Sequence, residues 1–282
     1  MSRNNEERLG ARSHAEPAPP TAPSGESFSF ATPTEFVELP TKGKYYPEGH
    51  PLHGKDSVEI RYMTAKDEDI LSSKTLIKKG VALDRLLQNI IIDRSIDINS
   101  LYVGDKNAIL IAARITGYGE KYNATTTCPS CMSAVEFEYN LSELNAYGGE
   151  DWQDYAIRRQ AEDRFVITLP HTGVEAEVRL LTSKDEDYLA QMRENKKKRK
   201  LPESNLTDQL RMIVVSVNGH NDPKSLNAFV EGLPAIDSKY LRSAYEKVVP
   251  NVDMSQDFAC DICGHEQEVA VPLTAGFFWP ER

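Results

Sequence analysis

The sequence predicts an α+β protein built from two related halves, each made of a strand, helices and a zinc-knuckle hairpin. The first observation is an internal repeat: VEIRYMTAKDEDIL at residues 58–71 returns as AEVRLLTSKDEDYL at 176–189, with eight identities in fourteen positions. The second is a Cys-x-x-Cys pair at the equivalent place in each half, followed both times by an alternating strand pattern. We therefore interpret the chain as a divergent tandem duplication.

Composition narrows the class of protein. The 282 residues are 40% hydrophobic and 27% charged, which suffices for one large or two small cores and excludes collagen-like, coiled-coil and wholly disordered chains. A net charge of -10 argues against general nucleic-acid binding, which depends on a basic surface. No apolar run is long enough to span a bilayer, and the N-terminus lacks the apolar core of a signal peptide. We expect a soluble protein that is made in a cytoplasm.

The repeat divides the chain into four parts. Residues 1–33 are rich in Pro, Ser, Glu, Ala and Asn and lack an apolar pattern until Phe28 and Phe30, which predicts a disordered N-terminal arm. The other parts are a first repeat at 34–141, a linker at 142–164 and a second repeat at 165–282.

Each repeat is expected to run from strand to helix in the same way. A strand at 58–63, or at 176–181, leads to Thr64 or Thr182. Threonine is a good N-cap, and acidic residues follow in the first turn, where the helix dipole favours them. The Lys-Asp-Glu-Asp run therefore marks the start of a helix in both halves, with a capping and folding role.

Two further helices are expected in each half. Apolar residues spaced by three and four predict one helix in each, through Leu83, Leu86, Leu87, Ile90 and Ile91 and through Leu206, Leu210, Ile213, Val214 and Val217. Another helix is expected at about 105–116 and at 237–248. Asp105 and Asp237 both stand 23 residues before the first cysteine of their half, as the duplication requires.

The four cysteines carry the strongest chemical signal. Cys128 and Cys131, and likewise Cys260 and Cys263, occupy tight turns typical of zinc knuckles, and two knuckles make a tetrahedral four-cysteine site. An ordinary zinc ribbon separates its knuckles by about 15 to 20 residues, whereas 128 residues separate these. Because each repeat contributes one knuckle, a pseudo-twofold packing of the halves predicts one shared structural zinc.

Other interpretations of the cysteines are redox chemistry, free pairs, and His265 as a replacement ligand. A redox Cys-x-x-Cys opens a helix in a βαβ unit, whereas strands follow these pairs.

No catalytic site is indicated. Asp67, Glu68 and Asp69 are sequential on a helix and diverge, and His50 and His53 flank a turn that is more typical of a surface loop. The phosphate-loop, nucleophile-elbow and metalloprotease motifs are absent from the sequence. We expect a protein that is not an enzyme, with an enzyme of unrecognised type as a remaining alternative.

The stretch FVELPTKGKYYPEGHPLHGKDSVEIRYMTAKDEDIL, with LIKKGVALDRLLQNIIID and VGDKNAILIAARITGYGEKY leading into CPSC, resembles the baseplate protein family of T4-like bacteriophages over roughly residues 35–275. The resemblance implies a non-enzymatic late protein of the contractile tail, a structural or assembly component of the baseplate hub. It also implies a location in the virion after assembly in the host cytoplasm, and other baseplate or tail proteins as partners.

Partner contacts are expected at aromatic residues. We predict an exposed loop at Tyr45 and Tyr46 and further anchors in the arm and at the C-terminus, namely Phe28, Phe30, Phe277, Phe278 and Trp279. The C-terminal aromatics have an equal alternative, packing on their own domain. The alternative function is a zinc-ribbon adaptor that binds nucleic acid through the basic run at 196–200. No membrane or small-molecule partner is expected.

Overall fold

The computed structural model describes residues 31–272 and 277–278. The chain divides into two units, residues 1–32 and residues 33–282. Phe28, Phe30 and Trp279 lie outside the described residues, as does the predicted arm except for its last three residues. All of the described helices and strands belong to the second unit.

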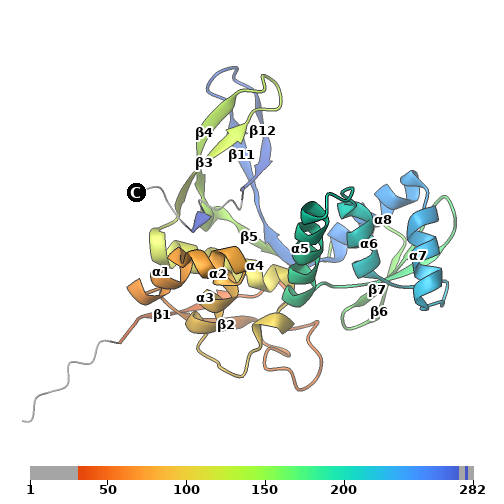
Figure 1. The fold of residues 1–282 in the computed structure, drawn as a ribbon, viewed down its shortest axis with the longest axis horizontal. Coiled ribbons are helices and arrows are strands. Elements are labelled where there is room, and N and C mark those ends of the chain that lie inside the picture. Colours follow the sequence, from red (N-terminus) through yellow and green to blue (C-terminus); the bar gives the residue numbers. More distant parts are fainter. Residues whose placement is uncertain (1–30, 273–276, 279–282) are drawn as a thin grey trace, which may run out of the picture. The chain divides into compact units, whose positions relative to one another are not determined.

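The described part is a mixed α+β fold with eight α-helices and several small antiparallel sheets (Figure 1). Its first portion consists of β1 (Thr34–Glu38), β2 (Ser57–Arg61), α1 (Ala65–Ser72), α2 (Lys74–Lys79), α3 (Ala82–Ile90), the 3-10 turn η1 (Ile98–Ser100), α4 (Val103–Tyr118), β3 (Lys121–Thr127), β4 (Ala134–Asn140) and the 3-10 turn η2 (Leu141–Glu143). Strand β1 pairs with β2, and β3 pairs with β4.

The second portion consists of β5 (Asn145–Tyr147), β6 (Ile157–Ala161), β7 (Arg164–Thr168), β8 (Glu175–Arg179), α5 (Ser183–Lys198), α6 (Asn205–Ile213), β9 (Val214–Val217), α7 (Pro223–Gly232), α8 (Ala235–Val248), β10 (Asn251–Asp253), β11 (Ser255–Ala259) and β12 (Glu266–Ala270). A four-stranded sheet has the order β6-β7-β8-β9, and two further pairs are β11 with β12 and β5 with β10. The segment 142–164, expected to be a linker, therefore holds two strands, one of which belongs to the four-stranded sheet.

The two repeated sequence segments form the same local structure. Strand β2 leads to α1 and strand β8 leads to α5, and each helix begins with a capping box, at Thr64 and at Thr182. In the first, the Asp67 carboxylate accepts hydrogen bonds from the Thr64 amide at 2.9 Å and from its hydroxyl at 2.8 Å. In the second, Asp185 accepts the same two bonds from Thr182, both at 2.9 Å. The predicted capping role is confirmed at both helices.

A second buried aspartate joins a turn to a helix in each portion. Asp105 near the start of α4 accepts hydrogen bonds from the Thr41 amide at 3.0 Å and hydroxyl at 2.7 Å. Asp237 near the start of α8 accepts the corresponding bonds from Thr172, at 3.0 and 2.7 Å. Both threonines come after a Leu-Pro that follows a strand, Thr41 directly and Thr172 one residue further on. In each portion, a carboxylate in the first turn of a helix thus holds the turn that follows a strand. The strand is β1 in the first portion and β7 in the second.

The apolar helices end earlier than expected. Helix α3 stops at Ile90, and Ile91 forms a backbone bridge with Ile60 of β2. Helix α6 stops at Ile213, and the next residues form β9, in which Val214 pairs with Val178 of β8. The expectation that Val214 and Val217 belong to the helix is wrong. The β-branched residues of β9 lie beside the edge of β8. Such residues favour pairing as a further strand of the sheet over another turn of helix.

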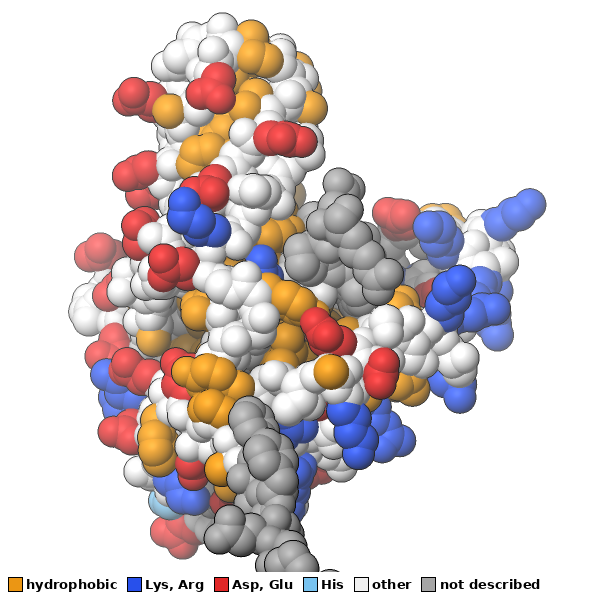
Figure 2. Space-filling model, turned by 90° about the vertical axis from the view of Figure 1, so that its left-hand side faces the viewer, with side chains coloured by type: hydrophobic (Ala, Val, Ile, Leu, Met, Phe, Trp, Pro, Cys, Tyr) orange, Lys and Arg blue, Asp and Glu red, His pale blue; other side chains and the backbone are white. Residues whose placement is uncertain are grey.

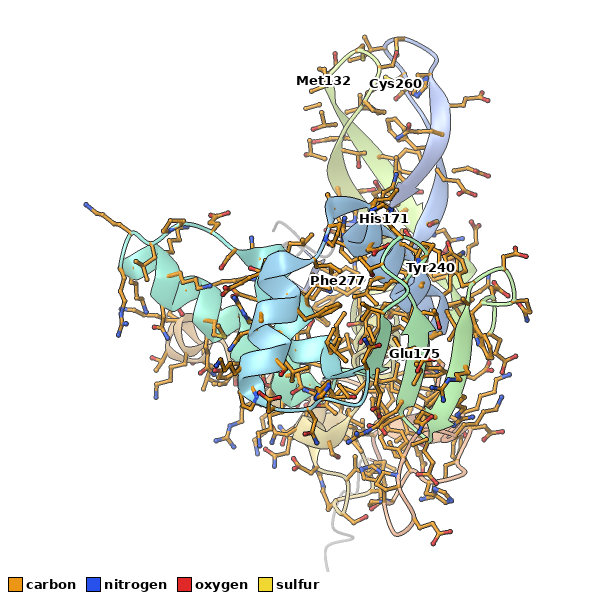
Figure 3. The ribbon with its side chains drawn as sticks, turned by 90° about the vertical axis from the view of Figure 1, so that its right-hand side faces the viewer. Met132, His171, Glu175, Tyr240, Cys260 and Phe277 are labelled. Atoms are coloured by element: carbon orange, nitrogen blue, oxygen red, sulfur yellow. The ribbon has the colours of Figure 1, made fainter. Side chains whose placement is uncertain are left out.

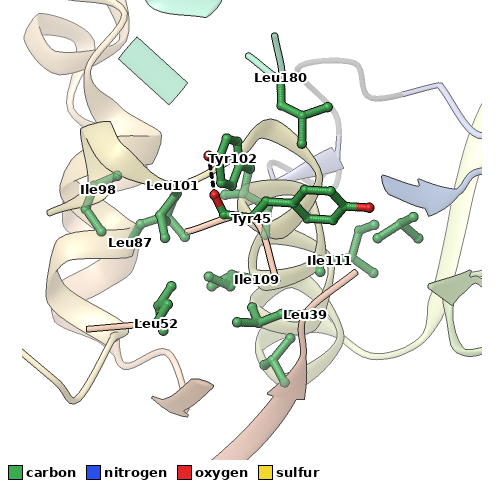
Figure 4. Packing of buried hydrophobic residues seen from close by; sticks show 14 of the residues in the cluster. Leu39, Tyr45, Leu52, Leu87, Ile98, Leu101, Tyr102, Ile109, Ile111 and Leu180 are labelled. Atoms are coloured by element: carbon green, nitrogen blue, oxygen red, sulfur yellow. Dashed lines mark hydrogen bonds between the residues drawn. The ribbon is translucent and has the colours of Figure 1, made fainter. Parts of the chain in front are cut away.

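Tyr45 and Tyr46 are buried, at 5% and 1% exposure, so the expectation of an exposed aromatic loop is wrong. Their loop folds inward at Gly43, whose φ is +68° and which approaches Lys55 so closely that a Cβ would lie 2.4 Å from its amide nitrogen. The Tyr46 hydroxyl then donates to Asp105 at 2.7 Å, and Tyr45 packs against Tyr102 among aliphatic side chains (Figure 4). These tyrosines belong to the core and lack the exposure that the prediction of partner anchors assumed.

The first and second portions share one hydrophobic core and exchange backbone hydrogen bonds. The Ser183 amide donates to the Leu101 carbonyl at 2.7 Å, and the Val103 amide donates to the Leu181 carbonyl at 3.2 Å. Strand β5, which comes directly after η2, pairs antiparallel with β10 near the end of the chain. Because these bonds tie residues about 80 to 100 positions apart, the portions are parts of one compact unit.

A buried cation adds to this junction. The Lys106 side chain of α4 is 7% exposed, and its Nζ lies 3.2 Å from Asp84 of α3. It also lies 3.6 Å from Glu186 and 3.9 Å from Asp187, both on α5. One ammonium group therefore pairs with carboxylates from both portions. A buried lysine needs such partners, because an unpaired charge away from water is costly.

Candidate metal centre

The four cysteines lie at the ends of two β-hairpins that project from the rest of this unit (Figure 3). In the first hairpin the Cys128 amide donates to the Ser133 carbonyl at 2.9 Å and the Met132 amide donates to the Cys128 carbonyl at 2.8 Å. In the second the Cys260 amide donates to the His265 carbonyl at 2.9 Å and the Gly264 amide donates to the Cys260 carbonyl at 2.8 Å. Both turns thus have the same hydrogen-bonding pattern.

Packing between the hairpins brings the two turns together. The rings of Phe137 on β4 and Phe258 on β11 meet edge to face with centroids 5.2 Å apart. The side chain of Gln256 bonds the backbone of Asn140 in both directions, accepting from the amide at 3.1 Å and donating to the carbonyl. Val135, Phe258 and the buried cysteines form a small apolar cluster of their own behind the turns. This cluster holds the hairpins in register at the cysteine end.

The four sulfur atoms form a compact group, all within 4.8 Å of one another. Cys128 Sγ lies 3.7 Å from Cys263 Sγ, and Cys131 Sγ lies 3.8 Å from Cys260 Sγ, so each close pair joins one hairpin to the other. All four cysteines are free thiols. Four zinc–sulfur bonds of about 2.3 Å at tetrahedral angles place the sulfurs about 3.8 Å apart. The donor set and its spacing fit one tetrahedral metal ion.

The surroundings of the thiols differ. Hydrogen bonds from the hydroxyl and then the amide of Ser133 lower the pKa of the Cys131 thiol to about 6. The His265 amide acts in the same direction on Cys263, but desolvation and the neighbouring thiols prevail and raise its pKa to about 11. Cys128 and Cys260 are buried. Amides aimed at sulfur favour the thiolate, which is the form that binds a metal.

The other polar candidates do not converge on a second site. His265 is paired through Nε2 with Gln267 at 3.3 Å. His50 stacks on Tyr46 and contacts Ser100 Oγ at 2.8 Å, while His53 contacts the Tyr46 carbonyl at 2.6 Å. Within the described ranges, the four cysteines are the one group of three or more His, Cys, Asp or Glu side chains arranged to hold a metal.

The Lys-Asp-Glu-Asp helix starts are structural. The sequence pattern placed Asp67 among diverging carboxylates but did not identify its partner. Arg61 binds both carboxylate oxygens of Asp67, which is fully buried, whereas Glu68 and Asp69 are exposed. The arginine repeated in VEIR and AEVR is the sequence signal that could have identified this pair.

Two of the expected C-terminal partner residues are internal. Phe277 and Phe278 are buried and meet edge to face. The Phe277 carbonyl accepts a hydrogen bond from Arg114 Nε at 2.7 Å, and its ring lies 5.2 Å from that of Tyr122. The alternative of packing on their own domain is therefore correct, since burial removes both side chains from any partner surface.

These features define a mixed α+β protein with a four-thiol cluster at the end of paired hairpins. The chain belongs to the T4 bacteriophage base plate protein family, which it matches over residues 32–279. Neither the curated proteins nor the solved structures contain a match. Membership gives the chain a structural role in a phage baseplate, as part of the virion tail, with other tail or baseplate proteins as its partners. In the part of the chain that the structure describes, no helix has the length and apolarity to cross a bilayer.

Proposed function

We propose that this chain is a structural or assembly component of the hub region of a contractile-tail baseplate, that it acts through protein–protein contacts and that it carries out no catalysis. The family match over residues 32–279 is the observation that carries the proposal. The chemistry of the site agrees with it, because four thiolates complete the coordination shell of a tetrahedral ion and leave no open position for a substrate.

The proposed metal is one structural zinc per chain, bound by Cys128, Cys131, Cys260 and Cys263. Thiolates favour zinc over hard ions such as Mg²⁺ and Ca²⁺, and the sulfur spacing fits zinc–sulfur bonds. Elemental analysis of the purified protein is expected to give one zinc per chain, and zero or two would refute the site. Cys128→Ser is expected to loosen the hairpins while α1 to α8 stay formed.

We also propose that the fold arose by tandem duplication, with repeats at 34–141 and 165–282 and a connection at 142–164. Support comes from the matched order of hairpin, capped helix, apolar helix, helix with a buried aspartate in its first turn, and cysteine turn. A structure determined by experiment tests the proposal by superposition of the repeats. Different backbone paths at 58–71 and 176–189 would refute it.

The biological test is a phage that lacks this gene. We expect it to make no contractile, infectious tails, because a missing hub component blocks baseplate assembly. Mass spectrometry of purified particles distinguishes a component that stays in the virion from a late factor that leaves after assembly in the host cytoplasm. Normal tails without the protein would refute the proposal. Phe28, Phe30 and Trp279 remain proposed partner contacts, and substitution of each by Ala in the phage tests them.

A further inference from the structure

The paired hairpins β3–β4 and β11–β12 are acidic along their length. Residues 121–140 and 255–270 contain six carboxylates and one lysine. Lys121 is paired with Glu138 at 2.7 Å. No ion pair with another described residue is found for the other five, which are Glu136, Asp257, Asp261, Glu266 and Glu268. All five are exposed, and Figure 2 shows acidic side chains spread over the hairpins at the top of the view.

The tip of the same hairpins is apolar. Met132 is 73% exposed and Ile262 is 64% exposed, one from each cysteine turn. Met132 has a φ of +59°, a left-handed conformation that a methionine rarely adopts, and the equivalent residue of the second turn is Gly264 with a φ of +69°. A glycine would fit the left-handed conformation at this position of the turn in both hairpins. The first turn instead keeps a strained residue that presents a large apolar side chain to solvent.

The end of α5 has the opposite charge. Residues 196–200 are five consecutive lysines and arginines, followed by Leu201, which is 51% exposed. Lys196 is paired with Asp208, and Lys198 is paired with Glu194. Among the described residues no ion pair is found for Lys197, Arg199 or Lys200. We call residues 196–201 the basic segment; like the hairpin tip, it places an exposed apolar side chain beside unpaired charge.

We propose that the hairpin tip of one copy of this chain docks on the basic segment of a second copy. Both surfaces combine exposed apolar side chains with uncompensated charge, and the charges are of opposite sign. Within one chain, no ion pair connects the hairpins to the basic segment in the described ranges. The two surfaces differ, so repeated head-to-tail contacts close into a ring, of which a reciprocal dimer is the smallest, or continue as an open row of copies. This inference does not depend on the baseplate function proposed above.

Salt dependence follows from the chemistry of the contact. Exposed charges attract weakly and are screened within about 8 Å at physiological ionic strength. We expect reversible self-association of the full-length, zinc-loaded protein at 50 mM NaCl and monomers at 500 mM. Sedimentation velocity over a concentration series measures this directly. A protein that is monomeric at every concentration at 50 mM NaCl would overturn the proposal.

Charge reversal identifies the surfaces. Lys197→Glu with Lys200→Glu lowers the formal charge of residues 196–200 from +5 to +1, and Glu266→Lys with Glu268→Lys adds basic charge to the hairpins. Each double variant alone is expected to self-associate at least about tenfold more weakly. An equimolar mixture of the two is expected to associate again, because each supplies the charge that the other has lost. Lys224→Glu with Lys239→Glu, on α7 and α8, is the matched control and should associate like the unaltered protein.

The variant Met132→Gly tests the apolar contact while leaving the conformation of the turn intact. Glycine fits the left-handed conformation at this position, so the variant should bind zinc and unfold at the same temperature or higher. Its self-association should nevertheless be several-fold weaker. Unchanged association in Met132→Gly, or no recovery in the mixture of charge-reversed variants, would overturn head-to-tail docking. The baseplate proposal would survive that result, because its test is tail assembly by the phage.

Discussion

Arg61 donates to both carboxylate oxygens of Asp67, at 2.6 and 2.9 Å, and the same two-bond pair joins Arg179 to Asp185 at 2.7 and 2.8 Å. Each pair connects the end of a strand to the first turn of the next helix. The carboxylate also caps that helix through a threonine, so one side chain sets both the direction of the chain and the start of the helix.

The first prediction concerns this carboxylate. Asp67→Asn keeps the shape of the side chain but removes its charge, which weakens the pair with Arg61 and the cap at Thr64 together. We expect a loss of about 2 kcal/mol in the free energy of unfolding, as is typical for hydrogen bonds to a charged, buried group. Urea unfolding followed by circular dichroism measures it. Asp185→Asn should cost less, because the Asp185 side chain is 14% exposed and Asp67 accepts a further bond from Asn89 at 3.1 Å.

Asp69 offers the matched control for this prediction. It lies on the same helix two residues later, and it is exposed. Asp69→Asn makes the same chemical change at the surface, and it should alter the free energy of unfolding by less than about 0.5 kcal/mol. Equal effects at positions 67 and 69 would show that the pair with Arg61 contributes nothing specific.

The second prediction is that the free energy of unfolding depends on pH through the ionisation of Asp67. Although burial opposes ionisation, the hydrogen bonds from Arg61, Thr64 and Asn89 lower the pKa of Asp67 to about 2. A folded-state pKa below the unfolded value gives stability that is fully present above about pH 4 and is lost as pH falls toward 2. The difference in urea midpoint between the unaltered protein and Asp67→Asn should therefore shrink over this range. The substitution leaves the cysteines unchanged, so acid affects the proposed metal site alike in both proteins, and a constant difference would contradict the prediction.

The sequence predicted the elements that depend on local pattern. The capped helix starts at Thr64 and Thr182 were predictable because a cap and its acidic partner lie within one turn of each other. The cysteine cluster was predictable despite the separation of 128 residues between the pairs, because the repeat indicated that equivalent turns meet.

The features that the sequence did not reveal depend on contacts between distant residues. Tyr45 and Tyr46 stand in a loop full of glycine and proline, which is typical of a surface turn. Their burial depends on Asp105, about sixty residues later, which accepts the Tyr46 hydroxyl. In the same way Val214 continues an apolar helical pattern, and only the strand edge of β8 decides that it pairs as a strand. Local propensity is overruled where a distant partner offers more burial.

The third prediction concerns Arg114, a buried guanidinium on α4. It donates to three carbonyls, those of Phe277 at 2.7 Å, Gly119 at 2.7 Å and Lys121 at 3.1 Å. Arg114→Ala leaves these oxygens without this donor and removes packing from the Phe277 and Tyr122 rings. We expect a loss of about 3 kcal/mol and faster hydrogen exchange at residues 277–278. Arg94→Ala, at an exposed arginine, is the control, and unchanged exchange at 277–278 in Arg114→Ala would contradict the role.

The fourth prediction tests how closely α4 approaches the second portion of the chain. Gly104 lies in the first turn of α4, where a Cβ would stand 2.1 Å from the Pro250 carbonyl oxygen and 2.8 Å from Asn251 Cα. Backbone atoms cannot rotate away as a side chain can, so Gly104→Ala forces α4 and β10 apart. We expect a loss of at least about 3 kcal/mol, because overpacking here also strains the pairing of β5 with β10.

Gly232 is the matched control, and it makes the outcome decisive. It also lies in a helix, at the end of α7, and a Cβ there would meet no atom within 4 Å. Gly232→Ala should leave stability unchanged or raise it by up to about 1 kcal/mol, since alanine reduces the conformational freedom of the unfolded chain. Thermal unfolding of both variants gives the comparison. If Gly104→Ala were as stable as Gly232→Ala, the close contact between α4 and the Pro250 backbone would not exist in solution.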